Sequence, residues 1–89
     1  MNRADILTTA EQLINGDRAR NYGDAATNFQ RIADLWTPIL GVTVTSEQVA
    51  LCLSQLKIAR LIQSPTHEDS WVDAVGYLAL GGEIVGGKM

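Results

Sequence analysis

Two predicted helices in the second half of the chain constrain the fold most, because each is apolar on more than one side. The first is expected over residues 46–63 and the second over residues 67–85, with Ser64-Pro65 ending the first. A helix that is apolar nearly all round must be buried on several sides. The remaining chain therefore has to cover these two helices, or another copy of the chain has to.

The apolar positions of these helices form stripes at helical spacing. In the first helix, Val49, Cys52, Leu53 and Leu56 share one side, and Leu51, Ile58, Leu61 and Ile62 point towards another. In the second, the stripe is Trp71, Val75 and Leu78, widened by Val72, Tyr77 and Leu80. Four helices in 89 residues cannot bury this much apolar surface within one monomer. We therefore expect a homo-oligomer, a dimer or a pair of dimers.

The first half of the chain predicts two more helices, from about Arg3 to Asn15 and from about Ala25 to Leu40. Pro38 is expected to bend or end the last turn of the latter. Its predicted buried face consists of Phe29, Ile32, Ala33, Trp36 and Ile39. The expected helix caps are Asn2, Asp24, Thr45 in a capping box with Gln48, and Thr66. The fold class is all-α, a compact four-helix bundle-like domain that spans all 89 residues.

Composition excludes several classes of partner. The net charge of −3 provides no electrostatic footprint for a nucleic-acid backbone. No apolar run reaches the length of a membrane-spanning helix or a signal peptide. The single cysteine, Cys52, cannot form an internal disulfide and is expected in the core, which fits a reducing cytosol. We expect a cytoplasmic protein without nucleic-acid or membrane partners.

Lys57 and Arg60 lie on one helix face because they are three residues apart. A guanidinium can bind a phosphate in two places, and an ammonium adds a point charge. The same two cations can instead form ion pairs with Asp69 and Asp73 across the helical hairpin and fix its register, or remain in solvent. The sequence leaves these three interpretations open.

Asp69 and Asp73 also share a face, and two carboxylates at this spacing can contribute to a Mg²⁺ site. Metal-dependent phosphate hydrolysis needs further carboxylates from a second helix, whereas the facing positions here are cationic. His67, the sole histidine, is a candidate general base or ligand-binding group, or an exposed loop residue. Trp71 is a candidate for stacking on a base, or a core residue.

Residues 16–24 form the main irregular stretch and contain Arg18, Arg20 and Tyr22. With Asp24 and Asn28 just beyond, they make a plausible ring of groups around a nucleotide. They are equally consistent with an ordinary polar loop.

The chain resembles a small helical family of uncharacterised proteins encoded by bacteriophages and prophages. The pattern that carries the resemblance is Asp17-Arg18, Tyr22-Gly23-Asp24, Asn28-Phe29, Ile32-Ala33, Trp36, Leu56-Lys57-Ile58-Ala59-Arg60, His67 to Asp73 and Gly76-Tyr77. A shorter pattern of Asp69, Asp73 and Tyr77 is similar to the last helix of the MazG-like, all-α nucleotide pyrophosphatases. Those enzymes bind Mg²⁺ through a Glu-x-x-Glu pair on the preceding helix, where this chain has Lys57 and Arg60.

The exchange of two anions for two cations removes the metal ligands and leaves groups that bind phosphate directly. The resemblance therefore implies a phage-type nucleotide-binding protein without catalysis, in the cytosol of the bacterial host. A sharper form is a counter-defence protein that sequesters a nucleotide or cyclic-nucleotide immune signal. The predicted ligand-binding residues are Arg18, Arg20, Tyr22, Asn28, Lys57, Arg60, His67, Trp71 and Asp73.

Two alternatives remain. One is a Mg²⁺-dependent MazG-like nucleotide pyrophosphatase that uses Glu68, Asp69 and Asp73, with the metal on Asp69 and Asp73. The other is a protein-interaction inhibitor of a host defence complex, whose apolar helices are its interface. No cofactor other than Mg²⁺ is expected, and Mg²⁺ only if the chain is an enzyme.

Overall fold

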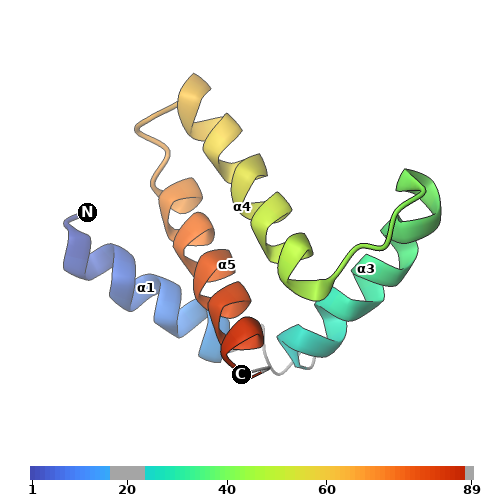
Figure 1. The fold of residues 1–89 in the computed structure, drawn as a ribbon. Helices are drawn as coiled ribbons and strands as arrows, with labels where there is room; N and C mark the ends of the chain where they lie inside the picture. Colours follow the sequence, from blue (N-terminus) through green and yellow to red (C-terminus); the bar gives the residue numbers. More distant parts are fainter. Residues whose placement is uncertain (17–23, 88–89) are drawn as a thin grey trace.

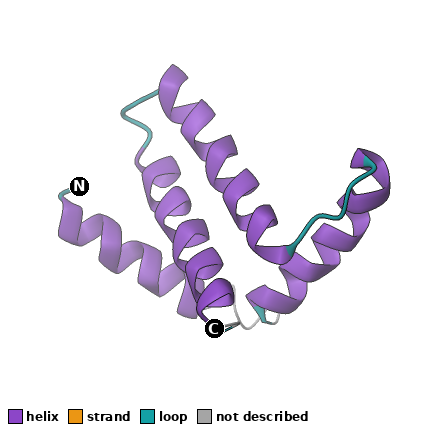
Figure 2. Cartoon of the chain, in the orientation of Figure 1, coloured by secondary structure: helices purple, strands orange, loops and turns teal. Residues whose placement is uncertain are grey.

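The computed structural model describes residues 1–16 and 24–87, and this part of the chain contains four α-helices and no β-strand (Figures 1 and 2). The helices are α1 (Arg3–Asn15), α3 (Ala25–Leu40), α4 (Ser46–Gln63) and α5 (Glu68–Gly86). The all-α prediction is confirmed, and the helix bounds agree with the predicted ones to within one residue. No helix within the described ranges is long and apolar enough to cross a membrane.

Three helix starts use the predicted caps. The Asn2 side chain accepts a hydrogen bond from the Asp5 backbone N–H at 2.9 Å, and Asp5 accepts one from the Asn2 N–H at 3.2 Å. At α3, an Asp24 carboxylate oxygen accepts from the Thr27 N–H at 3.2 Å. The predicted box at the start of α4 is also present, with the Thr45 N–H donating to Gln48 Oε1 at 3.0 Å. Each bond satisfies a donor that the helix itself leaves unpaired.

One predicted helix cap was wrong. The cap of α5 is His67 rather than Thr66, because the His67 N–H bonds back to the Ser64 carbonyl at 3.0 Å and Thr66 lies inside that turn. Helix α3 ends at Leu40, as predicted, and continues through Pro38 in its last turn. Pro38 and the residue one turn earlier, Asp34, are both exposed, so water can satisfy the carbonyl that proline leaves without a donor.

Helices α4 and α5 form an antiparallel hairpin on which the fold is built. Helix α1 packs against α5, whereas α3 packs mainly against the beginning of α4 and then diverges from it (Figure 1). The main core cluster lies where α3, α4 and the loop between them meet, and consists of Phe29, Ala33, Val44, Val49 and Ala50. The bundle is therefore more open on the α3 side than a compact four-helix arrangement.

Several residues predicted to be buried are exposed. Cys52 is exposed rather than in the core, and Ile39 on α3 is 80% exposed. Trp71 and Leu78 on α5 are also exposed. These side chains lie on sides of their helices that no described element covers. Helical periodicity identified the apolar sides correctly, but it did not show which of them the chain itself would cover.

Small residues on α5 allow its neighbours to approach closely. A Cβ atom placed on Gly81 would lie 2.9 Å from Ala50 Cβ on α4, and one on Gly76 would lie 3.2 Å from an Ile14 methyl group on α1. Gly82, the next residue along α5, has nothing within 4 Å of the same position. Gly81 therefore sets the separation of α4 and α5, whereas Gly82 does not.

These two glycines give a matched pair of variants. Gly82→Ala should raise the free energy of unfolding by up to about 1 kcal/mol, because alanine is the better helix former. Gly81→Ala should lower it by about 1–2 kcal/mol, because the overlap with Ala50 outweighs that gain. Urea unfolding followed by circular dichroism measures both. Adding Ala50→Gly to Gly81→Ala should restore part of the loss, and equal effects of the two alanine substitutions would contradict the close approach.

Candidate functional site

The predicted charge constellation contains one well-formed ion pair. Lys57 Nζ lies 3.0 Å from a carboxylate oxygen of Asp73, and the two side chains are only 13% and 14% exposed. The pair links the middle of α4 to α5. It is the ion pair across the helical hairpin that was one of the three interpretations of Lys57. A lysine held in this way is not available to a phosphate unless the pair opens.

Arg60 and Asp69, the other two members of the constellation, are exposed. Within the described part of the chain, neither takes part in an ion pair. Arg60 lies in the last turn of α4, where a positive charge interacts favourably with the helix dipole. The predicted second pair is therefore not formed in this structure, and Arg60 is the cation of the two that faces solvent.

His67, Glu68 and Trp71, at and just after the turn between α4 and α5, all make contacts within the protein. Nδ1 of His67 lies 2.7 Å from Oγ of Ser70, and the indole N–H of Trp71 donates to the Pro65 carbonyl at 3.0 Å. A carboxylate oxygen of Glu68 lies 3.2 Å from the amino group of Met1. The first two contacts close the turn, and the third joins the start of the chain to the first turn of α5. The Trp71 ring stays 46% exposed. Ligand binding by His67 and Trp71 stays a prediction.

The carboxylates proposed for Mg²⁺ do not converge. No group of three or more His, Cys, Asp or Glu side chains that could hold a metal ion occurs in residues 1–16 and 24–87. Asp73 faces the Lys57 ammonium, which competes with any cation for its oxygens, whereas Asp69 faces solvent. Metal binding by this pair stays a prediction that no described contact favours.

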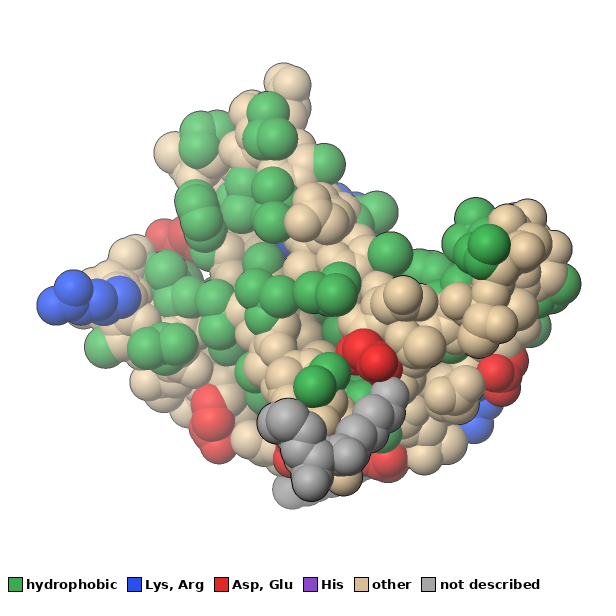
Figure 3. Space-filling model, viewed as in Figure 1, with side chains coloured by type: hydrophobic (Ala, Val, Ile, Leu, Met, Phe, Trp, Pro, Cys, Tyr) green, Lys and Arg blue, Asp and Glu red, His purple; other side chains and the backbone are tan. Residues whose placement is uncertain are grey.

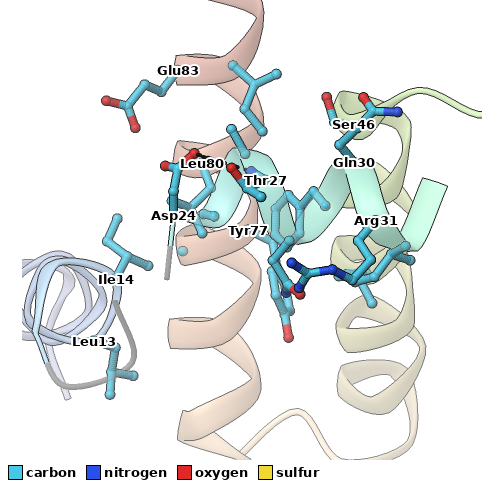
Figure 4. A pocket seen from close by; sticks show the side chains of 18 of the residues that line it. Leu13, Ile14, Asp24, Thr27, Gln30, Arg31, Ser46, Tyr77, Leu80 and Glu83 are labelled. Atoms are coloured by element: carbon cyan, nitrogen blue, oxygen red, sulfur yellow. Dashed lines mark hydrogen bonds between the residues drawn. The ribbon is translucent and has the colours of Figure 1, made fainter. Parts of the chain in front are cut away.

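A groove of about 1410 Å³ lies between α1, α3 and α5 (Figure 4). The side chains of Leu13 and Ile14 on α1 line one side of it, and Tyr77 and Leu80 on α5 line its floor. Asn28, a residue predicted to contact a ligand, also lines the groove. Among the predicted ligand-binding residues that the structure describes, Asn28 and Asp73 are the two that line this groove.

The charged side chains that line the groove are mainly acidic. Asp24, Asp34, Asp73 and Glu83 contribute carboxylates, and Arg31 contributes a guanidinium. Asp24, Glu83 and Arg31 are labelled in Figure 4. This balance disfavours a phosphate group, except close to Arg31. Three predicted ligand residues, Arg18, Arg20 and Tyr22, lie in residues 17–23, outside the described residues.

An exposed apolar surface runs along the side of the α4–α5 hairpin that faces away from the core. We call it the outer face and define it by Leu51, Ile58, Ile62, Trp71, Leu78 and Val85, whose exposure ranges from 39% to 82%. Figure 3 shows hydrophobic side chains gathered over α4 and α5 on the side turned to the viewer. An interface was expected somewhere on these helices from their all-round apolar character, but helical spacing was not used to group these residues into a single surface.

The outer face contains no charged residue. Between residues 48 and 63 the only charged side chains are Lys57 and Arg60, and between residues 70 and 86 they are Asp73 and Glu83. Lys57 and Asp73 form their pair between the two helices. Glu83 lines the groove on the other side of α5. A spacing signal could have found this surface, because its residues recur every three or four positions along each helix.

Comparison with known proteins gives family and source, but no activity. A family model described as a domain of unknown function, DUF6378, matches residues 5–85. The Gene 55 protein of Mycobacterium phage L5 is 52% identical over 73 residues, which are 81% of this chain and 47% of the relative. The Gene 55 protein of Mycobacterium phage D29 is 39% identical over 72 residues, which are 81% and 48%.

The chain therefore spans about half the length of these two relatives. No solved structure matches it. The predicted resemblance to a phage-encoded family is confirmed by these relatives.

The Lys57–Asp73 pair should contribute to stability. Asp73→Ala leaves a largely buried ammonium without a partner, and we expect the free energy of unfolding to fall by about 2–4 kcal/mol. Asp69→Ala, one helical turn earlier and exposed, should change it by less than about 1 kcal/mol. Chemical denaturation of the two variants measures the difference.

A double variant separates the contribution of the two charges to stability from the contribution of the volume that the two side chains fill. Lys57→Met with Asp73→Leu replaces both charges by apolar groups, and it should recover most of the stability lost in Asp73→Ala. Equal stability of Asp73→Ala and Asp69→Ala would show that the pair is unimportant for the fold.

Proposed function

Because the chain belongs to the DUF6378 family and has relatives in mycobacteriophages, we propose that it is a phage protein-interaction domain that docks another protein surface through its outer face. The observation that supports this proposal is the contiguous, charge-free apolar surface of α4 and α5. Single exposed apolar residues are common on soluble proteins, whereas contiguous patches rimmed by polar residues mark interaction sites. Interface cores are likewise depleted in charge and rich in large apolar side chains.

The hairpin that carries the outer face is held from its inner side. Ser70 and Val72 on α5 are fully or almost fully buried, and Ser54 on α4 returns its hydroxyl to the Ala50 carbonyl at 2.9 Å. The Lys57–Asp73 pair joins the same two helices. A surface on packed helices is already ordered before it binds and therefore loses little conformational entropy. Most of the free energy gained by burying its apolar side chains then contributes to affinity.

An inhibitor of a host defence complex, the third function considered from the sequence, is one form of this proposal. Such an inhibitor covers a surface of its target and needs no catalytic group. The outer face provides the contact area, and the family's occurrence in phages provides a context in which host complexes are targets.

Nucleotide binding is a second proposal, and the groove is the observation that favours it. Tyr77 provides an aromatic ring, Asn28 an amide and Arg31 a guanidinium, around a space large enough for a nucleotide. The carboxylates of Asp24, Asp34 and Glu83 oppose a phosphate at the rim. Sequestration of an immune signal is the specific form of this proposal, with Arg60 as a separate solvent-facing cation. The pyrophosphatase alternative has no described contact in its favour.

The docking proposal predicts a specific loss of cross-linked species. In bacteria that express a tagged chain, formaldehyde should give products heavier than the monomer, and these should disappear in Ile58→Glu combined with Leu78→Glu. Both residues are exposed, so the fold should persist, as far-UV circular dichroism can verify. Gln12→Glu, an added charge on exposed α1, is the control and should leave the products unchanged. Products that survive both face substitutions would contradict the proposal.

The nucleotide proposal predicts ligand-dependent stabilisation. A panel of nucleoside triphosphates and cyclic nucleotides with Mg²⁺ should raise the melting temperature for at least one compound, which is recovered intact. Arg31→Ala should remove that shift if the ligand occupies the groove, and Arg60→Ala if it binds at the end of α4. Pyrophosphate release that is lost in Asp73→Asn would support the enzyme instead, and no shift with any compound counts against both.

A further inference from the structure

We propose that the protein surface docked on the outer face is a second copy of this chain, related by a two-fold axis. This inference rests on the proposed function, namely that the outer face is a docking surface, and it identifies the partner. It follows from the spacing of the outer-face residues, from the side of the hairpin on which they lie, from their lack of charge and from the area available.

The outer positions of both helices follow a heptad spacing. On α4 they are Leu51, Gln55, Ile58 and Ile62, and on α5 they are Trp71, Val75, Leu78, Gly82 and Val85. Steps of four and three residues alternate in both series, which is the spacing of the a and d positions at which helices pack on one another. Apart from Gln55 and Gly82, every position is a large or branched apolar residue. Each hairpin thus presents two helix-packing seams side by side.

Both seams point away from the protein's own core. Ile58 follows Val49, a fully buried core residue, by nine positions, which at about 100° per residue places it on the opposite side of α4. Trp71 precedes Leu80, which packs against the core, by the same number of positions on α5. The two seams therefore share one side of the hairpin, the side on which Figure 3 shows the hydrophobic side chains. Apart from the start of α1, whose Met1 and Ile6 lie beside Trp71, no described element of the chain covers that side.

The chemistry of the face fits a copy of itself better than a lipid surface. Membrane-binding helices combine an apolar face with flanking Lys and Arg residues, whereas Lys57 is buried in its ion pair and the net charge is −3. A second copy brings an equally uncharged surface, so the docking leaves no charge buried. Gly82 adds a shallow position on the face, since nothing lies within 4 Å of where its Cβ would be, and a partner side chain can fill it.

The area of the face reaches the minimum that a specific dimer needs. Helices of 18 and 19 residues are each about 27 Å long and roughly 10 Å wide, so the two together outline roughly 500 Å² on each copy. Two copies then bury about 1,000 Å² or more, which is the lower bound for a specific interface. A second copy is present wherever the chain is made, so self-association can cover the outer face without any other protein.

Light scattering coupled to size-exclusion chromatography, followed by sedimentation equilibrium, tests the inference on the purified 89-residue chain. At micromolar concentration the wild-type chain should have twice the mass of the 9.6 kDa monomer, or four times if dimers pair. Ile58→Glu with Leu78→Glu should raise the dimer Kd at least about 100-fold and give a monomer of unchanged helix content. Gln12→Glu should remain dimeric.

A rival surface on α3 supplies the sharper control. Ile39 is 80% exposed and lies near the exposed Leu35, at the end of the helix that diverges from α4. Ile39→Glu should leave the dimer intact. A dimer that dissociates with Ile39→Glu but not with the outer-face variant would overturn the inference and move the interface to α3.

The remaining outcomes separate this inference from the proposed function. A wild-type chain that is monomeric at 100 µM, but still forms face-dependent cross-links to a different protein in cells, overturns self-association and leaves the docking function standing. A monomeric chain without any face-dependent cross-link overturns both.

Discussion

The close approach of α4 and α5 at Ala50 and Gly81 is the constraint on which the rest of the structure depends. A side chain on Gly81 would overlap Ala50, so the two helices can lie at this distance only because glycine is present. At this separation Lys57 reaches Asp73 with both side chains largely buried. The same approach directs the remaining apolar sides of both helices outwards together. The ion pair and the outer face are thus two consequences of one contact.

The helix bounds could be predicted because each helix begins at a polar cap and ends at a residue that breaks it. Asn2, Asp24 and Thr45 all act as expected. Burial was harder to predict, as Cys52 and Ile39 show. A helix that is apolar on several sides gives no internal sign of which side its own chain will cover and which a partner will cover. This choice depends on the path of the whole chain, including the divergence of α3 from α4 (Figure 1).

The candidate site was predictable only as a set of alternatives. Residues three or four apart on a helix share a face, so the sequence grouped Lys57 with Arg60 and Asp69 with Asp73. Which cation pairs with which carboxylate depends on how far α4 is shifted along its axis relative to α5. The spacing of residues within either helix does not determine that shift. The register brings Lys57 to Asp73 and leaves Arg60 and Asp69 in solvent. The groove beside Tyr77 required three helices to be placed relative to one another, so no single motif could indicate it.

The groove and the outer face use opposite sides of α5. Tyr77, Leu80 and Glu83 line the groove, whereas Trp71, Leu78 and Val85 belong to the outer face. A partner docked on the outer face therefore leaves the groove open, and a ligand in the groove does not compete with that partner. Contacts to either side act on one helix, which α4 and α1 already hold through Gly81 and Gly76.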